Sequence, residues 1–280
     1  MQTGFYSNTG GMVTQFNRLD VISNNLANIN TAGFKRDDVV IGDFMRLYKE
    51  THDELPLRNH TRAASQHLNR AMVRVPQVVE EYTDFDLGNL MQTGGPLDVA
   101  LQAPNLFFAV ETPNGARYTR DGSFKLSENG TLVSKEGFAV LNSGNGEIAL
   151  PSDRHIAITS EGVIYAQNRE NLTEQEEIAR LKIVRFENQK WLEKVGDNYY
   201  KIKEPSGTAG NQRQWTQEIE AEGQFLVAQG FIEKSNINAV SEMTALIETN
   251  RLVGMYQKVM DTHMNEINGD AINKLAVIKA

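Results

Sequence analysis

The apolar residues of the first thirty positions recur with heptad spacing. Every seventh residue of a helix returns to nearly the same face, and positions offset by three lie beside it. The stripe consists of Phe5, Met12, Leu19 and Leu26, joined by Ile22 and Ile29. We therefore expect an amphipathic helix at the N-terminus.

A second helical pattern begins after Asn236. Asn238 is expected to cap this helix, Glu242 suits its first turn, and Asn268-Gly269 is expected to end it. A second apolar stripe lies on a neighbouring face, so the apolar surface is wider than one partner helix would cover. The first stripe is Leu246, Val253, Met260 and Ile267, and the second is Leu252, Met255 and Val259.

Between these helices the pattern changes to short extended runs. Residues 97–101 alternate with a period of two, and residues 106–110 form a short apolar run. Glycine-containing turn pairs separate aromatic and β-branched runs, which indicates a β-meander. The pairs are Asn114-Gly115, Asp121-Gly122, Asn129-Gly130, Glu136-Gly137, Asn145-Gly146 and Glu161-Gly162. We expect the polar, acidic stretch 169–180 to be a loop or one helical turn.

The segment from Asn28 to Phe34, called the corner below, has the composition of a built turn. Asn28 and Thr31 supply side chains that hydrogen-bond to local backbone. Gly33 tolerates a positive φ. We therefore expect a fixed corner between the N-terminal helix and the rest of the chain, and not a flexible linker.

Composition narrows the function classes. The net charge of −8 argues against nucleic acid as a partner. The chain has no cysteine, which removes disulfides, thiolate metal sites and cysteine nucleophiles. No stretch reaches the roughly 20 apolar residues of a transmembrane helix, so we expect no membrane insertion. The N-terminus also lacks the basic and apolar regions of a cleaved signal peptide.

Candidate chemistry is sparse. His52, His60 and His67 lack an acidic residue at helical metal-site spacing, so we expect solvated histidines, no metal and no cofactor. Asp84 and Asp86 would share a strand face but have no third partner. The chain carries no phosphate-binding, dinucleotide-binding or nucleophile-elbow motif, and we predict that it is not an enzyme.

Three separated motifs resemble one protein family. Asn24, Asn25, Ala27, Asn28, Thr31, Gly33 and Phe34 resemble the N-terminal signature of bacterial flagellar rod and hook proteins. Segments 93–100, 118–124 and 130–133 resemble the central β-domain of the rod proteins, and 230–238 resembles their C-terminal signature, which residues up to Arg251 continue. Residues 103–105 lack the family's glycine-rich segment, and residues 41–75 depart from its pattern.

We accordingly expect an α+β fold. The N- and C-terminal amphipathic helices would pair as a coiled-coil-like layer, with a central, mainly antiparallel β-domain. The expected regions are an N-terminal rod helix and turn (1–36), a linker or extended region (37–80), the β-domain (81–229) and a C-terminal rod helix (230–280).

The resemblance implies a structural subunit of the flagellar basal-body rod, which self-assembles into a helical tube and transmits torque from motor to hook. It implies export through the flagellar type III apparatus without a cleaved signal peptide, and assembly in the periplasm. The implied partners are further copies and other rod subunits, with hook and ring proteins as candidate neighbours. The alternative is a soluble β-rich module that binds peptides or small molecules.

The resemblance and the stripes together give a set of residues expected to act in assembly. These are Asn24, Asn25, Ala27, Asn28, Thr31, Gly33, Phe34, Ser235, Asn236, Leu246, Val253 and Met260.

Overall fold

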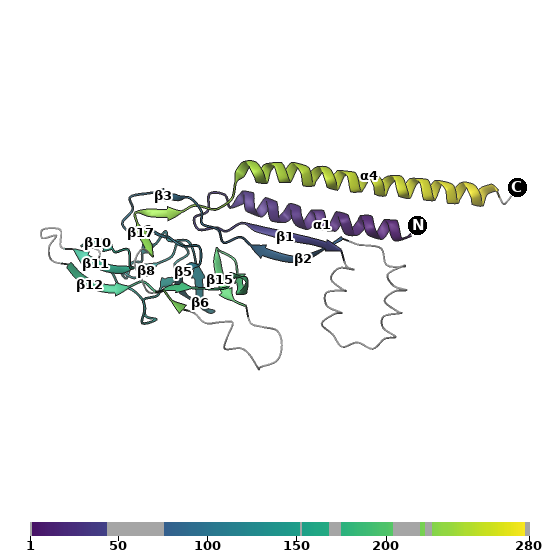
Figure 1. Ribbon diagram of the computed structural model, residues 1–280. Helices are drawn as coiled ribbons and strands as arrows, with labels where there is room; N and C mark the ends of the chain where they lie inside the picture. Colours follow the sequence, from purple (N-terminus) through teal and green to yellow (C-terminus); the bar gives the residue numbers. More distant parts are fainter. Residues whose placement is uncertain are drawn as a thin grey trace, which may run out of the picture. The chain divides into compact units, whose positions relative to one another are not determined.

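The computed structural model describes residues 2–43, 76–151, 153–167, 175–203, 219–221 and 226–277. The chain divides into two compact units (Figure 1). Unit 1 comprises segments 1–27, 37–82 and 238–280, and unit 2 comprises segments 28–36 and 83–237. Segments 28–36 and 230–237, which the sequence patterns grouped with the terminal helices, therefore belong with the β-strands of unit 2.

Unit 1 is built on two helices that run side by side, α1 (Gln2–Ala27) and α4 (Ala239–Val277) (Figure 1). Thr9 Oγ1 lies 3.8 Å from Met260 Sδ, and the ring of Tyr256 packs against Gly11 so closely that a Cβ there would lie 2.7 Å from it. The strands β1 (Asp37–Asp43) and β2 (Pro76–Thr83) form a two-stranded sheet. The expected pairing of the terminal helices is confirmed.

The ends of α4 test the expected boundaries. Asn238 caps the helix as predicted, since its Oδ1 accepts hydrogen bonds from the N–H groups of Val240 and Ser241 at 3.0 and 3.2 Å. The predicted stop at Asn268-Gly269 is wrong, because α4 continues to Val277. A glycine ends a helix when it adopts a positive φ, and Gly269 does not.

Unit 2 contains the remaining β-strands. They are mainly antiparallel, which confirms the predicted β-domain. The strands are β3 (Leu90–Gln92), β4 (Val99–Leu101), β5 (Leu106–Thr112), β6 (Gly115–Thr119), β7 (Lys125–Leu126), β8 (Leu132–Val133), β9 (Ala139–Val140), β10 (His155–Ile158), β11 (Val163–Gln167), β12 (Gln175–Arg180), β13 (Ile183–Arg185), β14 (Leu192–Lys194), β15 (Tyr199–Ile202), β16 (Ile219–Glu220), β17 (Val227–Gln229) and β18 (Phe231–Glu233), with a 3-10 turn (η1) at Gln189–Trp191.

Strand β5 is the centre of unit 2. It pairs with β6 along one edge and with β13 and β9 along the other. Its side chains alternate between two cores. Phe108 packs on Phe124 on one face, while Phe107 makes edge-on contacts with Phe85, Phe186 and Tyr200 on the other. Because both faces are covered, residues 106–110 are an unbroken apolar run.

The expected loop or helical turn over 169–180 is wrong for its second half. Residues Gln175–Arg180 form β12, which pairs with β11 at the edge of a three-stranded sheet. Edge strands commonly carry charged residues, because one side of the strand remains open to water. The polar composition therefore concealed a strand.

Candidate functional site

The corner is a folded turn within unit 2. Thr31 N donates to Asn28 O, and Thr31 Oγ1 donates to Asn28 Oδ1, each at 3.1 Å. Gly33 has a φ of +65°, as its predicted role requires. A Cβ on Gly33 would lie only 2.5 Å from backbone atoms of Arg120 and Asp121. The glycine is thus needed both for its conformation and for close contact with the β-domain.

Side chains of the β-domain hold the corner in place. Asn198 Nδ2 donates to Ala32 O at 2.8 Å, and Lys194 Nζ donates to Lys35 O at 3.0 Å. The same ammonium lies 3.7 Å from the centre of the buried Phe34 ring, which is a cation–π contact.

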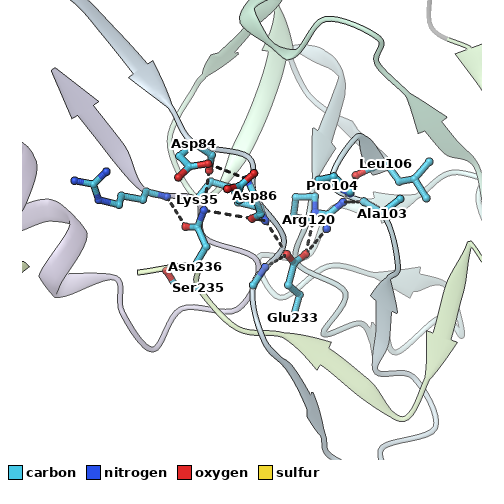
Figure 2. A network of polar contacts seen from close by, with 12 residues as sticks. Lys35, Asp84, Asp86, Ala103, Pro104, Leu106, Arg120, Glu233, Ser235 and Asn236 are labelled. Carbon is cyan, nitrogen blue, oxygen red and sulfur yellow. Dashed lines mark hydrogen bonds and ion pairs between the residues drawn. The ribbon is translucent and has the colours of Figure 1, made fainter. Parts of the chain in front are cut away.

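Three charged side chains meet in the interior directly after the corner. Lys35, Arg120 and Glu233, called the ion cluster below, are fully buried. Lys35 Nζ lies 2.7 Å from Glu233 Oε1, and Arg120 Nη2 lies 2.6 Å from Glu233 Oε2. Figure 2 shows the three side chains directed toward one another from segments far apart in the sequence.

Backbone groups complete the coordination of the ion cluster. Lys35 Nζ donates to Asp86 O, and Arg120 Nη1 donates to Ala103 O and Leu106 O, each at 2.6 Å (Figure 2). Gly88 N donates to Glu233 Oε1 at 2.8 Å. Buried charges are tolerated when they are paired and hydrogen-bonded, as these three are.

The protonation of the two cations reflects this burial. Desolvation lowers the pKa of Lys35 and that of Arg120 below their ordinary values, and the carboxylate of Glu233 opposes both shifts. Two cations share one carboxylate, so the ion cluster carries one net positive charge when all three groups are ionised. The carbonyl oxygens of Asp86, Ala103 and Leu106 face that excess charge.

The side chain of Asn236 hydrogen-bonds to the backbone of two other segments. Its Oδ1 accepts from Arg36 N at 2.8 Å, and its Nδ2 donates to Asp84 O at 2.9 Å and Asp86 O at 3.3 Å (Figure 2). Ser235 is buried beside it and its Oγ accepts from Ile237 N. Gly33 N also donates to Glu233 O at 2.7 Å. The N- and C-terminal signatures are therefore bonded to each other in unit 2.

The helical part of the N-terminal signature lies in unit 1. Asn25 is fully buried, and its side-chain amide exchanges two hydrogen bonds with the backbone of Asp37, at 2.8 and 3.0 Å. Asn24 and Ala27 are exposed near the end of α1. Asn25 thus fixes the end of α1 to the start of β1.

The stripe of Leu246, Val253 and Met260 turns inward within unit 1. Val253 is 7% exposed, and Leu246 and Met260 are half-buried. Met260 and its neighbour Tyr256 contact α1. Other apolar side chains of α4 remain open to solvent, namely Val240, Met243, Ile247, Leu252, Met255, Val259 and Met264.

Asp84, which was considered for chemistry, and Asp121, from the predicted turn pair Asp121-Gly122, both have structural roles in turns. Asp84 Oδ1 accepts from Asp86 N, and Asp121 Oδ1 accepts from Ser123 N. Among the described residues, no cluster of three histidine or acidic side chains could hold a metal. His52, His60 and His67 lie outside the described residues. No described helix is long and apolar enough to cross a membrane.

Arg120 and Glu233 lie in the sequence motifs and Lys35 directly follows the N-terminal one, but the motifs gave no reason to pair them. Each of these segments also holds other polar or charged residues, so charge alone did not single out the three. Pairing them needs the contact over 198 residues from Lys35 to Glu233 and that over 113 residues from Arg120 to Glu233.

Comparison with known protein families places one member of the ion cluster in each of three matched segments. Residues 5–35 match the family of flagella basal body rod proteins. Residues 105–166 match the D1 domain of the flagellar hook protein FlgE/F/G family, and residues 228–273 match the C-terminal region of flagellar basal body rod FlgEFG proteins.

Individual relatives match along nearly the whole chain. The flagellar basal-body rod protein FlgG of Buchnera aphidicola from Schizaphis graminum is 33% identical over 91% of this chain and 93% of its own length. FlgG of Bacillus subtilis is 30% identical over 98% and 99%. FlgF of Caulobacter vibrioides, also a basal-body rod protein, is 28% identical over 99% and 100%.

These matches favour a structural protein over an enzyme or a β-rich binding module, and they cover both helices as well as the β-domain. This chain belongs to the family of flagellar basal-body rod proteins.

Proposed function

We propose that this subunit of the flagellar rod assembles through the exposed apolar side chains of α4. The observation that carries the proposal is the distribution of apolar residues on that helix. The stripe containing Val253 turns inward, while Ile247 and Met255 are 67% and 47% exposed. Exposed apolar residues concentrated on one element indicate a surface that a partner covers.

Apart from Met264, the exposed apolar residues of α4 form two patches. At 3.6 residues per turn, the patches lie roughly 120° apart around the helix, on either flank of the inward stripe. Patch A is Val240, Met243 and Ile247, and patch B is Leu252, Met255 and Val259.

Two different patches suit two different neighbours. When each subunit uses unlike surfaces toward successive neighbours, the contacts are heterologous and repeat into a helical array. The proposed array is the rod tube, built from further copies and other rod subunits, which passes torque from motor to hook. In this scheme Leu246, Val253 and Met260 support assembly indirectly, because they position α4 within unit 1.

The remaining expectations complete the proposal. The subunit travels through the flagellar type III export apparatus without a cleaved signal peptide and assembles in the periplasm. Hook and ring proteins are candidate neighbours at the ends and around the rod. Family membership supports this route.

The test is to place a charge in each patch separately. Ile247→Asp in patch A and Met255→Asp in patch B should each abolish rod assembly and motility in a strain that lacks the wild-type protein, because a carboxylate would be desolvated against an apolar neighbour. Gln257→Asp, at an exposed polar position on the same helix, is the matched control and should leave motility normal.

Circular dichroism and light scattering on the purified variants separate folding from assembly. Monomer helix content should be unchanged in all three, and association should be lost in the two patch variants alone. Normal rods and motility with either patch variant would refute the assignment of that patch.

A further inference from the structure

The ion cluster joins three segments that are otherwise separate in the sequence. Lys35 follows the corner, Arg120 lies beyond β6, and Glu233 ends β18. The carboxylate of Glu233 accepts one hydrogen bond from Lys35, one from Gly88 N and two from Arg120. Glu233 is thus the common partner of every other member.

Losing Glu233 would leave two cations in a dry site without an anion. A buried charge whose partner is removed is strongly unfavourable. Lys35 can lose its proton, but the guanidinium of Arg120 stays charged, so the site must admit water or open. Opening cannot be confined to one segment. Lys35 holds segment 28–36, Gly88 holds the loop after β2, and Glu233 holds the segment from β18 to Ile237.

Close backbone contacts strengthen this interdependence. A Cβ on Gly88 would lie 1.9 Å from Lys234 O, and Gly33 N donates directly to Glu233 O. Asn236 bonds Arg36 N and Asp84 O with one side chain. Each of the three segments is therefore in contact with the other two.

We propose that the ion cluster makes segments 28–36, 84–92 and 231–237 one cooperative unit, so that they attach to the rest of unit 2 and detach from it together. Each terminal signature is then held in unit 2 only when the other is bound there as well. The buried site around Arg120 cannot form until Glu233, which lies 113 positions later in the chain, is in place. The ion cluster acts within one subunit, so this proposal does not depend on the assembly proposal.

A second set of contacts, independent of the ion cluster, also holds segment 28–36. Lys194 and Asn198 bond the backbone of Lys35 and Ala32 without involving Glu233. If these contacts alone held the corner, segment 28–36 would stay closed when the ion cluster is broken. The two arrangements therefore make opposite predictions.

Hydrogen exchange by mass spectrometry on the full-length monomer tests the proposal. In Glu233→Gln, amide exchange in segments 28–36, 84–92 and 231–237 should accelerate by a common factor, at least about a hundredfold, as expected for breaking a buried pair. Residues 106–119 of β5 and β6 are the internal reference. Glu176→Gln, which breaks the exposed pair with Arg154, is the matched control and should change none of the three segments.

Acceleration confined to 231–237, with 28–36 unchanged, would overturn the proposal. If Glu233→Gln does not fold, Lys35→Met decides the matter, because it keeps the pair of Glu233 with Arg120 and leaves the site neutral. Lys35→Met should accelerate exchange in 231–237 as well as in 28–36. An effect limited to 28–36 would refute the cooperative unit.

Discussion

The two units differ in how they use polar and apolar side chains. Unit 2 buries its apolar residues on both faces of β5 and pairs its buried charges within the ion cluster. Unit 1 buries the polar side chains of Thr14, Gln15 and Asn25 on α1, while α4 exposes apolar residues along its length. Unit 2 therefore holds most of the buried apolar side chains, whereas unit 1 presents surface suited to neighbours.

The difference indicates that the two units have different roles in a rod subunit. A β-domain with cores of its own can hold the two terminal signatures in a fixed arrangement. A helix whose apolar face is only partly covered gains stability when a partner packs on it, since packing supplies most helical stability in proteins. Four predictions sharpen or break this contrast, from the largest expected effect to the smallest.

The largest effect is expected for Arg120→Met in unit 2. This change removes the buried side-chain donor to Ala103 O and Leu106 O and two of the hydrogen bonds to Glu233. Breaking a buried ionic network typically costs about 3–5 kcal/mol. Urea unfolding followed by near-ultraviolet circular dichroism of the aromatic cluster should show this loss. Arg154→Met is the control and should cost less than about 1 kcal/mol, because its pair with Glu176 is exposed.

Next in size is Gly33→Ala at the corner. The substitution adds backbone strain at a φ of +65° and also places a Cβ 2.5 Å from the backbone of Arg120 and Asp121. Gly115→Ala is a matched control, since Gly115 has a φ of +90° with no atom within 4 Å of a Cβ. The control should cost about 1–2 kcal/mol from strain, and Gly33→Ala clearly more. Equal losses in thermal melting would mean that the corner readjusts.

A smaller effect separates the two faces of α4. Val253→Ala removes buried methyl groups and should destabilise the helix pair of unit 1 by about 1–2 kcal/mol. Val259→Ala, the same change at a position 47% exposed, should stay within about 0.5 kcal/mol in the monomer. Thermal melting of helical circular dichroism measures both. The reverse order would show that the inward face of α4 has been misassigned.

The smallest effect is expected for Asp121→Asn. Burial raises the pKa of the Asp121 carboxyl above its ordinary value of 3.8, although hydrogen bonds from Ser123 oppose the shift. Because the folded-state pKa is the higher one, the wild type loses stability as pH rises from 3.8 through that pKa. The variant should therefore be equal to or slightly more stable than the wild type at pH 7, since asparagine still accepts from Ser123 N. Urea titrations over a pH series should show the gain vanish in acid, and a variant that is less stable at every pH would contradict this account.

Several features followed directly from the sequence. Heptad stripes gave both helices, and turn pairs gave most strands of the β-domain, because these patterns arise from local backbone geometry. Gly33 and Asn238 were predicted in their observed roles for the same reason, since turns and caps are satisfied within a few residues. Where the pattern failed at β12, pairing with the neighbouring strand β11 set the outcome.

Tertiary structure alone decided which helix faces are buried and which charged side chains pair. Both stripes of α4 are apolar, and only the position of α1 shows that Val253 turns inward while Met255 stays exposed. Lys35 and Glu233 carry no local signal of partnership, because their contact spans 198 residues. Long-range packing creates the dry site in which these charges must pair. The sequence therefore determined the elements and the family, and the fold determined which residues hold the terminal signatures together.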